Sequence, residues 1–409
     1  MMKLFAPLSN KRLPIILAIL FLLLLNPYYV WGLSSYPLFR ILLNFIIPVL
    51  FCFSKEKKEK KTPVLIYLLA TFLYVFIAFA IGRASIIGSI TSSICFLYVF
   101  VFWANRELLF DVLEQLINLL FVIVGIAVIA WILYLFGFLS PIGEIVPPMR
   151  DDTTYSVYPF FVISNNIFEF DSVFRFCGPF TEPGFLGTLV ALILVAKKFN
   201  LKDIRLIALF VSGLLSLSLA FYLISAFFAL FYLAVEKRKI IPVLLLVGLA
   251  GAFYIYTKDD PILSATIYER VAWDSDSDNI AGDNRTNDAT EQYYKKIKGT
   301  GAFYLGTSDP NWYQNVAGAG TSYKTAICIN GFIIVALYLL YLLQLGWVNK
   351  RNLAGFILFA AVLLMNFYQR PSLYSLPVLF LYCCMAKADK PYVRNKADKP
   401  SYMLKANTQ

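Results

Sequence analysis

The chain has 409 residues, of which 59% are hydrophobic and only 15% are charged, and it carries a formal net charge of +11 without a single histidine. Soluble domains are about a quarter charged, so the composition excludes an ordinary soluble protein. The absence of histidine also excludes Ser-His and Cys-His catalytic arrangements and the commonest zinc ligand.

Long apolar runs predict an all-α polytopic membrane protein with about twelve transmembrane helices, in a bundle that covers residues 1–386. Each run should be helical, because a backbone in lipid must satisfy its own hydrogen bonds. The expected spans lie near residues 13–33, 37–54, 63–82, 84–103, 117–138, 183–197, 204–217, 219–235, 240–257, 323–347, 352–369 and 372–386.

The segment 204–235 is long for one span and short for two. Basic clusters at 197–198 and 237–239 flank it, and both favour the cytoplasm. An even number of crossings must therefore separate them, which predicts a turn near 213–218. An amphipathic segment at 106–116 is expected to lie along the cytoplasmic interface, with a plain extension of the next span as the alternative.

We expect the bundle in an inner membrane, and the same charge rule places both termini in the cytoplasm. Two large loops, 139–182 and 258–322, are then periplasmic, and their many aromatic residues argue against disorder. Residues 387–409 contain a repeated Lys-Ala-Asp-Lys-Pro motif and are expected to form a disordered cytoplasmic tail.

Arginine is the informative residue on the outer side, because positive charge there runs against the topological rule. Arg40, Arg83 and Arg370 are expected at the outer ends of spans, at headgroup depth. A guanidinium group binds phosphate bidentately and stays charged, so such a cluster suits a lipid-linked phosphate or pyrophosphate. The alternative is contact with ordinary lipid headgroups or with acids of the loops. The full outer set is Arg40, Arg83, Arg150, Arg175, Arg270, Arg285 and Arg370.

The segment from Arg175 to Gly187 reads Arg-Phe-Cys-Gly-Pro-Phe-Thr-Glu-Pro-Gly-Phe-Leu-Gly. Its glycines and prolines predict an irregular backbone before a span, which survives at that depth only where protein or a water-filled cavity covers it. Arg175 and Glu182 would line that cavity, and a carboxylate near a cation can act as a general base. The alternative is an Arg175–Glu182 ion pair that merely holds the loop.

In the second loop, Tyr293 and Trp312 offer ring faces on which sugars stack, near Arg285. The alternative is that these rings pack the loop onto the membrane. The acidic run at 274–278 lacks the glycine and glutamate of a calcium loop, so we expect no metal. We expect no cofactor either, because no P-loop, dinucleotide or zinc motif is present.

With these residues in view, the chain resembles the O-antigen polymerases (Wzy-type), in the wider group that includes O-antigen ligases. The likeness rests on the segment from Arg175 through Glu182 into a span, the serine-rich turn at 212–218 and the large outer loop. Some members carry arginine and glycine separated by ten residues in both loops. Here eleven residues separate Arg175 from Gly187 and Arg270 from Gly282. The related ligases usually carry a histidine in the large loop, which favours a polymerase here.

The resemblance implies a metal-independent membrane glycosyltransferase that joins oligosaccharide repeat units carried on undecaprenyl pyrophosphate. Fixed arginines such as Arg175 and Arg270 would stabilise the departing diphosphate, and Glu182 or Asp171 would deprotonate or orient the acceptor hydroxyl. Expected partners are the lipid-linked oligosaccharide, the bilayer, a chain-length regulator and a flippase, without nucleic acid. A flippase or transporter and an O-antigen ligase are the alternative functions.

Overall fold

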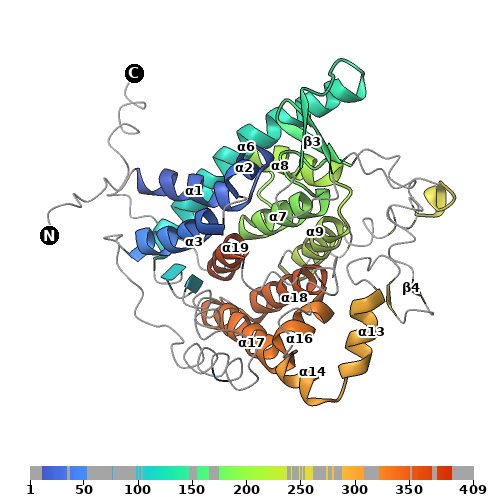
Figure 1. Cartoon of the computed structure of the whole chain (residues 1–409). Coiled ribbons are helices and arrows are strands. Elements are labelled where there is room, and N and C mark those ends of the chain that lie inside the picture. The colour runs from blue at the N-terminus through green and yellow to red at the C-terminus, as the bar shows by residue number, and fades with distance from the viewer. Residues whose placement is uncertain are drawn as a thin grey trace, which may run out of the picture.

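The computed structural model of the chain is a bundle of helices with a small β-sheet at one end (Figure 1). Most of each expected span at 63–82, 84–103 and 240–257 lies outside the described residues, as does the tail from 389 onward. The structure describes residues 12–34, 37–52, 76, 98–99, 101–102, 105–146, 154–164, 175–236, 241, 248, 251, 254–260, 273–274, 279–280, 288–307, 322–350, 352–370 and 375–388.

Within the described part of the chain, two helices are long and apolar enough to cross a membrane, α6 (Arg106–Leu135) and α17 (Phe332–Asn349). The 30 residues of α6 rise about 1.5 Å each, so this helix exceeds the ~30 Å hydrocarbon layer. Residues 106–116 are its first turns, and the prediction of a separate interfacial helix is therefore wrong. The apolar face of these turns, with Leu109 and Leu113, is buried against other helices instead of facing lipid.

Shorter apolar helices surround these two. The shortest have 12 residues and rise only about 18 Å, which is less than a full span. The number of twelve spans therefore stays a prediction. These helices are α1 (Leu13–Leu24), α3 (Pro37–Cys52), α7 (Pro183–Ala196), α8 (Ile204–Leu215), α9 (Leu219–Phe231), α18 (Leu353–Gln369) and α19 (Leu376–Lys387).

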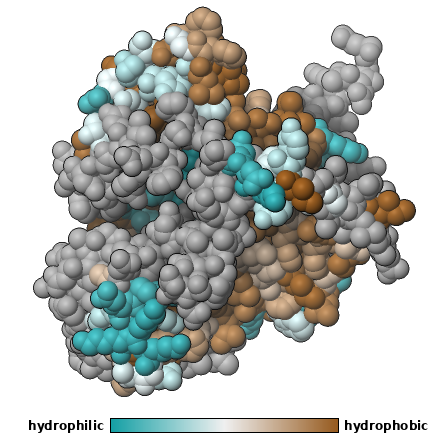
Figure 2. Space-filling model, turned by 90° about the vertical axis from the view of Figure 1, so that its right-hand side faces the viewer, coloured by the Kyte–Doolittle hydropathy of each residue, from teal (hydrophilic) through white to brown (hydrophobic). Residues whose placement is uncertain are grey.

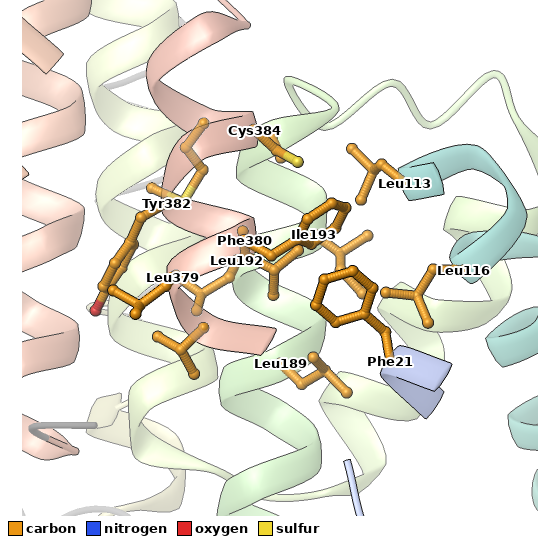
Figure 3. Packing of buried hydrophobic residues seen from close by; sticks show 14 of the residues in the cluster. Phe21, Leu113, Leu116, Leu189, Leu192, Ile193, Leu379, Phe380, Tyr382 and Cys384 are labelled. Atoms are coloured by element: carbon orange, nitrogen blue, oxygen red, sulfur yellow. The ribbon is translucent and has the colours of Figure 1, made fainter. Parts of the chain in front are cut away.

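The core lies where α1, α6, α7 and α19 meet (Figure 3). Every residue of α19 is buried, as expected for a helix that is apolar on all sides and packed within a bundle. The rings of Phe21 and Phe380 lie 4.4 Å apart between α1 and α19. Leu116 of α6 and Leu189 of α7 complete this contact from the other two helices.

One stripe of α6 is apolar but exposed. Val122, Ile126, Ile129 and Leu133 recur at helical spacing, and between 39% and 63% of each is exposed. Soluble proteins rarely leave such a stripe uncovered. Figure 2 likewise shows broad apolar surface, with a hydrophilic patch low on the face, at the height of α13 (Asp288–Ile297) in Figure 1. This surface is compatible with a helical membrane protein.

The segment 204–235 forms two helices, α8 and α9, as predicted. The turn between them contains Leu217 at a φ of +47°. Gly213 lies directly against the ring of Phe221, so the two helices approach closely at the turn. Both pack on α7, and α9 continues into one π-helical turn, η2 (Tyr232–Glu236). The predicted turn position is therefore confirmed.

Two expected spans are broken. The span at 13–33 ends as α1 at Leu24 and resumes after Pro27 as a 3-10 turn, η1 (Tyr28–Val30), and a short helix, α2 (Trp31–Ser34). The span at 323–347 is divided at Gly331 into α16 (Tyr323–Asn330) and α17. The prediction of one continuous helix is wrong at both places.

The first large loop contains a β-sheet that the all-α prediction missed. Its strands β1 (Gly143–Ile145), β2 (Tyr155–Tyr158) and β3 (Phe161–Ser164) form an antiparallel meander. Tyr158 lies opposite Phe161, and their stacked rings contact Tyr134 of α6. The sheet is thus packed on the end of α6. In the second loop, β4 (Trp273–Asp274) pairs with β5 (Asn279–Ile280), and α13 precedes α14 (Gly301–Leu305).

The described helix termini gather at two ends of the bundle. At one end, here called the Glu114 end, Glu114 of α6 pairs with Lys197 after α7 and with Arg205 in the first turn of α8. The guanidinium of Arg106, where α6 begins, donates to the carbonyl of Lys387, where α19 ends. The opposite end, here called the Arg370 end, holds the functional candidates.

Candidate functional site

An ion pair between Glu182 and Arg370 joins two segments far apart in the chain. Nη2 of Arg370 lies 2.5 Å from Oε2 of Glu182, although 188 residues separate the two. Glu182 is the residue before α7, and Arg370 is the residue after α18. Buried Nε of Arg370 has no hydrogen-bond partner within the described part of the chain, so this guanidinium keeps unused donor capacity.

The backbone that carries Glu182 is irregular and covered by protein, as predicted. Gly178 adopts a φ of +56°, and its carbonyl accepts a hydrogen bond from the backbone of Val162 in β3. The carbonyl of Pro179 accepts one from Tyr28, and that of Thr181 accepts one from the hydroxyl of Tyr155. These bonds satisfy carbonyls that a helix would otherwise satisfy. They also hold the segment against the β-sheet and the connection after α1.

Arg175 is bonded to the turn between α8 and α9. Its Nε donates to the carbonyl of Ser216 at 3.3 Å and its Nη2 donates to that of Leu217 at 3.1 Å. Gly187 of α7 lies against Ser216 and Ser218, so the turn is packed closely under the same segment. The alternative of an Arg175–Glu182 pair is not what the structure contains, since Glu182 is paired with Arg370. This geometry supports a positioning role for Arg175.

A cavity of about 310 Å³ is lined in part by Thr181, the residue before Glu182, whereas Glu182 and Arg370 themselves are not among its lining residues. It is lined by the end of α1, the start of α3, the segment before α7 and the start of α19. Arg40 and Asn44, one turn apart on α3, line it together with Thr181 and Ser375. The side-chain oxygen of Asn26, which also lines the cavity, is buried and has no hydrogen-bond partner among the described residues. The cavity therefore offers a cation and amide groups to an anionic, hydroxyl-bearing ligand.

A second polar cluster lies where α13 meets α16. Nζ of Lys324 lies 2.6 Å from Oε2 of Glu291, and only 5% of the Lys324 side chain is exposed. Sequence reasoning missed this pair, although a lysine inside an expected span is itself a functional signal. Tyr293 packs beside the cluster, against Ile297 and Cys328, and does not line the Arg40 cavity.

The thiol of Cys177 provides a direct check on the buried segment. It is 6% exposed and donates to the carbonyl of Val162, and burial raises its pKa to about 12. At pH 8 only about one thiol in 10⁴ would be ionised, so maleimide should leave it unmodified. A variant with Cys177 as its sole cysteine should react only after denaturation in SDS, as measured by mass spectrometry. Rapid reaction of the folded protein would contradict the described burial.

The structure thus describes five of the predicted site residues, namely Arg40, Arg175, Glu182, Tyr293 and Arg370. It joins Glu182 directly to Arg370 and places Arg40 on the cavity that Thr181 also lines. The others, Arg83, Asp171, Arg270, Arg285 and Trp312, lie outside the described residues and stay predictions. No family model, no curated protein and no solved structure matches the chain.

Proposed function

We propose that the chain is a membrane glycosyltransferase that polymerises undecaprenyl-pyrophosphate-linked oligosaccharide repeat units into O-antigen. The observation that carries this proposal is the arrangement at the Arg370 end. There, Glu182 pairs with Arg370, and its neighbour Thr181 lines a cavity that Arg40 also lines. Two guanidinium groups and one carboxylate at the same end of the bundle suit a diphosphate leaving group and a base for the acceptor hydroxyl.

In the proposed reaction, the acceptor hydroxyl oxygen attacks the anomeric carbon of the lipid-linked glycan. The bond between this carbon and the diphosphate oxygen breaks, and its electron pair leaves with the diphosphate. Arg40 and Arg370 stabilise the developing negative charge, as fixed cations do at other departing oxyanions. The hydroxyl proton passes to Glu182, which takes the role of general base.

The ion pair itself suggests how the site is prepared. An incoming diphosphate competes with Glu182 for Arg370, because the planar fork of arginine binds phosphate bidentately. Transfer of Arg370 from the carboxylate to the diphosphate would leave Glu182 available to accept a proton. Arg175 acts indirectly, since it fixes the segment before α7 to the α8–α9 turn.

The proposal includes the predicted topology. About twelve spans place both termini in the cytoplasm and the Arg370 end at the periplasmic face of the inner membrane. Residues 139–182 and 258–322 are then periplasmic and meet the lipid carrier after its glycan has been flipped. Arg83, Asp171, Arg270, Arg285 and Trp312 are proposed to contribute to the same face from segments outside the described residues.

Deletion of the gene is expected to leave single repeat units on the cell surface without long polymer. The reason is that flipping and ligation would continue while chain growth stops. A gel of surface polysaccharide, with the wild-type gene restored on a plasmid as control, measures this directly. A flippase would instead trap repeat units at the cytoplasmic leaflet, and a ligase would leave long chains on the carrier lipid. Long polymer at wild-type levels would refute the proposal.

A further inference from the structure

A stacked pair of tyrosines lies close to Arg370. The ring centroids of Tyr323, at the start of α16, and Tyr368, near the end of α18, are 5.4 Å apart with an interplanar angle of 24°. Tyr368 precedes Arg370 by two residues, and both rings are half-buried. The pair therefore presents aromatic surface next to the residue that we assign to the diphosphate.

The Glu291–Lys324 pair lies beside Tyr323, one ring of this stacked pair. Nζ of Lys324 is 5.9 Å from the ring centroid of Tyr323 and 5.8 Å from that of Tyr294. Glu291 retains 18% side-chain exposure, whereas Lys324 is almost fully covered. A buried ion pair contributes little net stability, because desolvation of both charges offsets their attraction. The Glu291 carboxylate is held by Lys324 through Oε2, lies 3.7 Å from the exposed Lys295 through Oε1 and stays partly exposed, which is better explained by a binding role.

The position of α13 explains how the pair is held. Ile297 of α13 packs on Cys328 of α16, and Phe303 of α14 stacks on Phe332 at 5.6 Å. Residues 288–307 of the second large loop are thus docked on α16 and α17, as Figure 1 shows for α13, α14 and α16. Glu291 and Tyr323 come from two different elements, and this packing fixes their relative placement.

We propose that Tyr323, Tyr368 and Glu291 form a subsite for a sugar ring of the acceptor glycan. The apolar C–H face of a pyranose stacks on the tyrosine rings, and the carboxylate of Glu291 accepts hydrogen bonds from its hydroxyl groups. Lys324 is a positioning residue that orients Glu291. This inference rests on the proposed function, and it assigns the acceptor to the side of α16 and α18, apart from the Arg40 cavity.

The test uses the full-length protein in detergent and the strain's own repeat-unit oligosaccharide, released from its lipid by mild acid. Saturation-transfer NMR should detect binding to the wild type. Tyr368→Ala should weaken binding by about tenfold through loss of the stacking surface. Tyr368→Phe should bind as the wild type does, because it keeps the ring. Tyr256→Ala is the matched control, since Tyr256 is 91% exposed and belongs to neither cluster.

The charged pair is tested by the double variant Lys324→Met with Glu291→Gln, which removes both charges together and avoids an unpaired buried charge. It should fold, elute normally in gel filtration and bind the oligosaccharide several-fold more weakly. Wild-type binding by this variant would overturn the role of the pair, and wild-type binding by Tyr368→Ala would overturn the subsite. If the alanine variant fails gel filtration, Tyr368→Leu replaces it, with the same expectation.

Binding and polymerisation can fail separately. The wild-type protein could bind the oligosaccharide while deletion of its gene leaves long polymer. That combination would refute the polymerase and uphold the subsite. Loss of polymer on deletion, together with no detectable binding by the wild-type protein, would overturn the subsite and leave the polymerase standing.

Discussion

Replacing Arg370 with alanine is expected to reduce polymer formation by roughly 10²–10³-fold, the usual loss when one donor to a developing oxyanion is removed. Arg370→Lys should recover only part of this loss, because an ammonium group cannot bind the diphosphate bidentately. The measurement is the chain-length distribution of surface polysaccharide at matched membrane expression. Arg12→Ala is the control, since Arg12 is exposed and lies before α1 begins.

A second variant tests whether the Glu182–Arg370 pair acts in catalysis or only stabilises the fold. Removing Arg370 alone also leaves Glu182 without its ion-pair partner, which is destabilising by itself. The double variant Arg370→Ala with Glu182→Ala removes that penalty. If the pair were only structural, the double variant would make long polymer again, and our assignment would be wrong. We expect it to remain inactive, because both the leaving-group cation and the base are missing.

Gly187→Val is expected to destabilise the folded protein by about 1–3 kcal/mol, the usual cost of overpacking a close contact. A Cβ at this position would meet the Cβ of Ser218 and lie 2.7 Å from Oγ of Ser216. The turn that receives Arg175 would therefore have to move. Thermal unfolding of the purified protein in detergent should show a lower midpoint than the wild type.

Gly125→Ala is the matched control for this substitution. Gly125 also lies within a helix, but a Cβ there would meet nothing within 4 Å. Alanine is the better helix former, so its unfolding midpoint should be unchanged or slightly higher. A wild-type midpoint for Gly187→Val would show that α7 and the α8–α9 turn are not packed as described.

The breaks in two expected spans show where sequence reasoning failed. A single glycine in an apolar run is tolerated within a helix, so nothing local distinguished Gly331 from other glycines. In the structure it adopts a φ of +82°, and a Cβ would meet the backbone of α14, including the carbonyl oxygen of Tyr304 at 2.5 Å. Residues of a distant loop therefore impose the break. The local sequence likewise could not place residues 106–116, because their apolar face fits a lipid interface and a helix core equally well.

For the candidate site too, the residues could be predicted from the sequence but their contacts could not. Arg40 and Arg370 could be selected from the sequence because arginine on the outer side runs against the positive-inside rule, and Glu182 because it lies in a glycine- and proline-containing segment before a span. Their partners could not be predicted, and the ion pair considered as the alternative for Glu182 involved the nearby Arg175. The pair with Arg370 forms because α7 begins and α18 ends at the same end of the bundle. Glu291 was missed because it looks ordinary until α13 docks on α16, whereas Lys324 was missed although a lysine within an expected span is a functional signal.

The sequence by itself determined the helical class, the positions of most described helices and the α8–α9 turn. It could do so because apolar run length, helix breakers and the distribution of charge act locally along the chain. Only the tertiary structure decided which charges meet, where an apolar run is interrupted and which aromatic rings stack. These features depend on contacts between residues as far apart as Glu182 and Arg370, and chain folding alone brings such residues together.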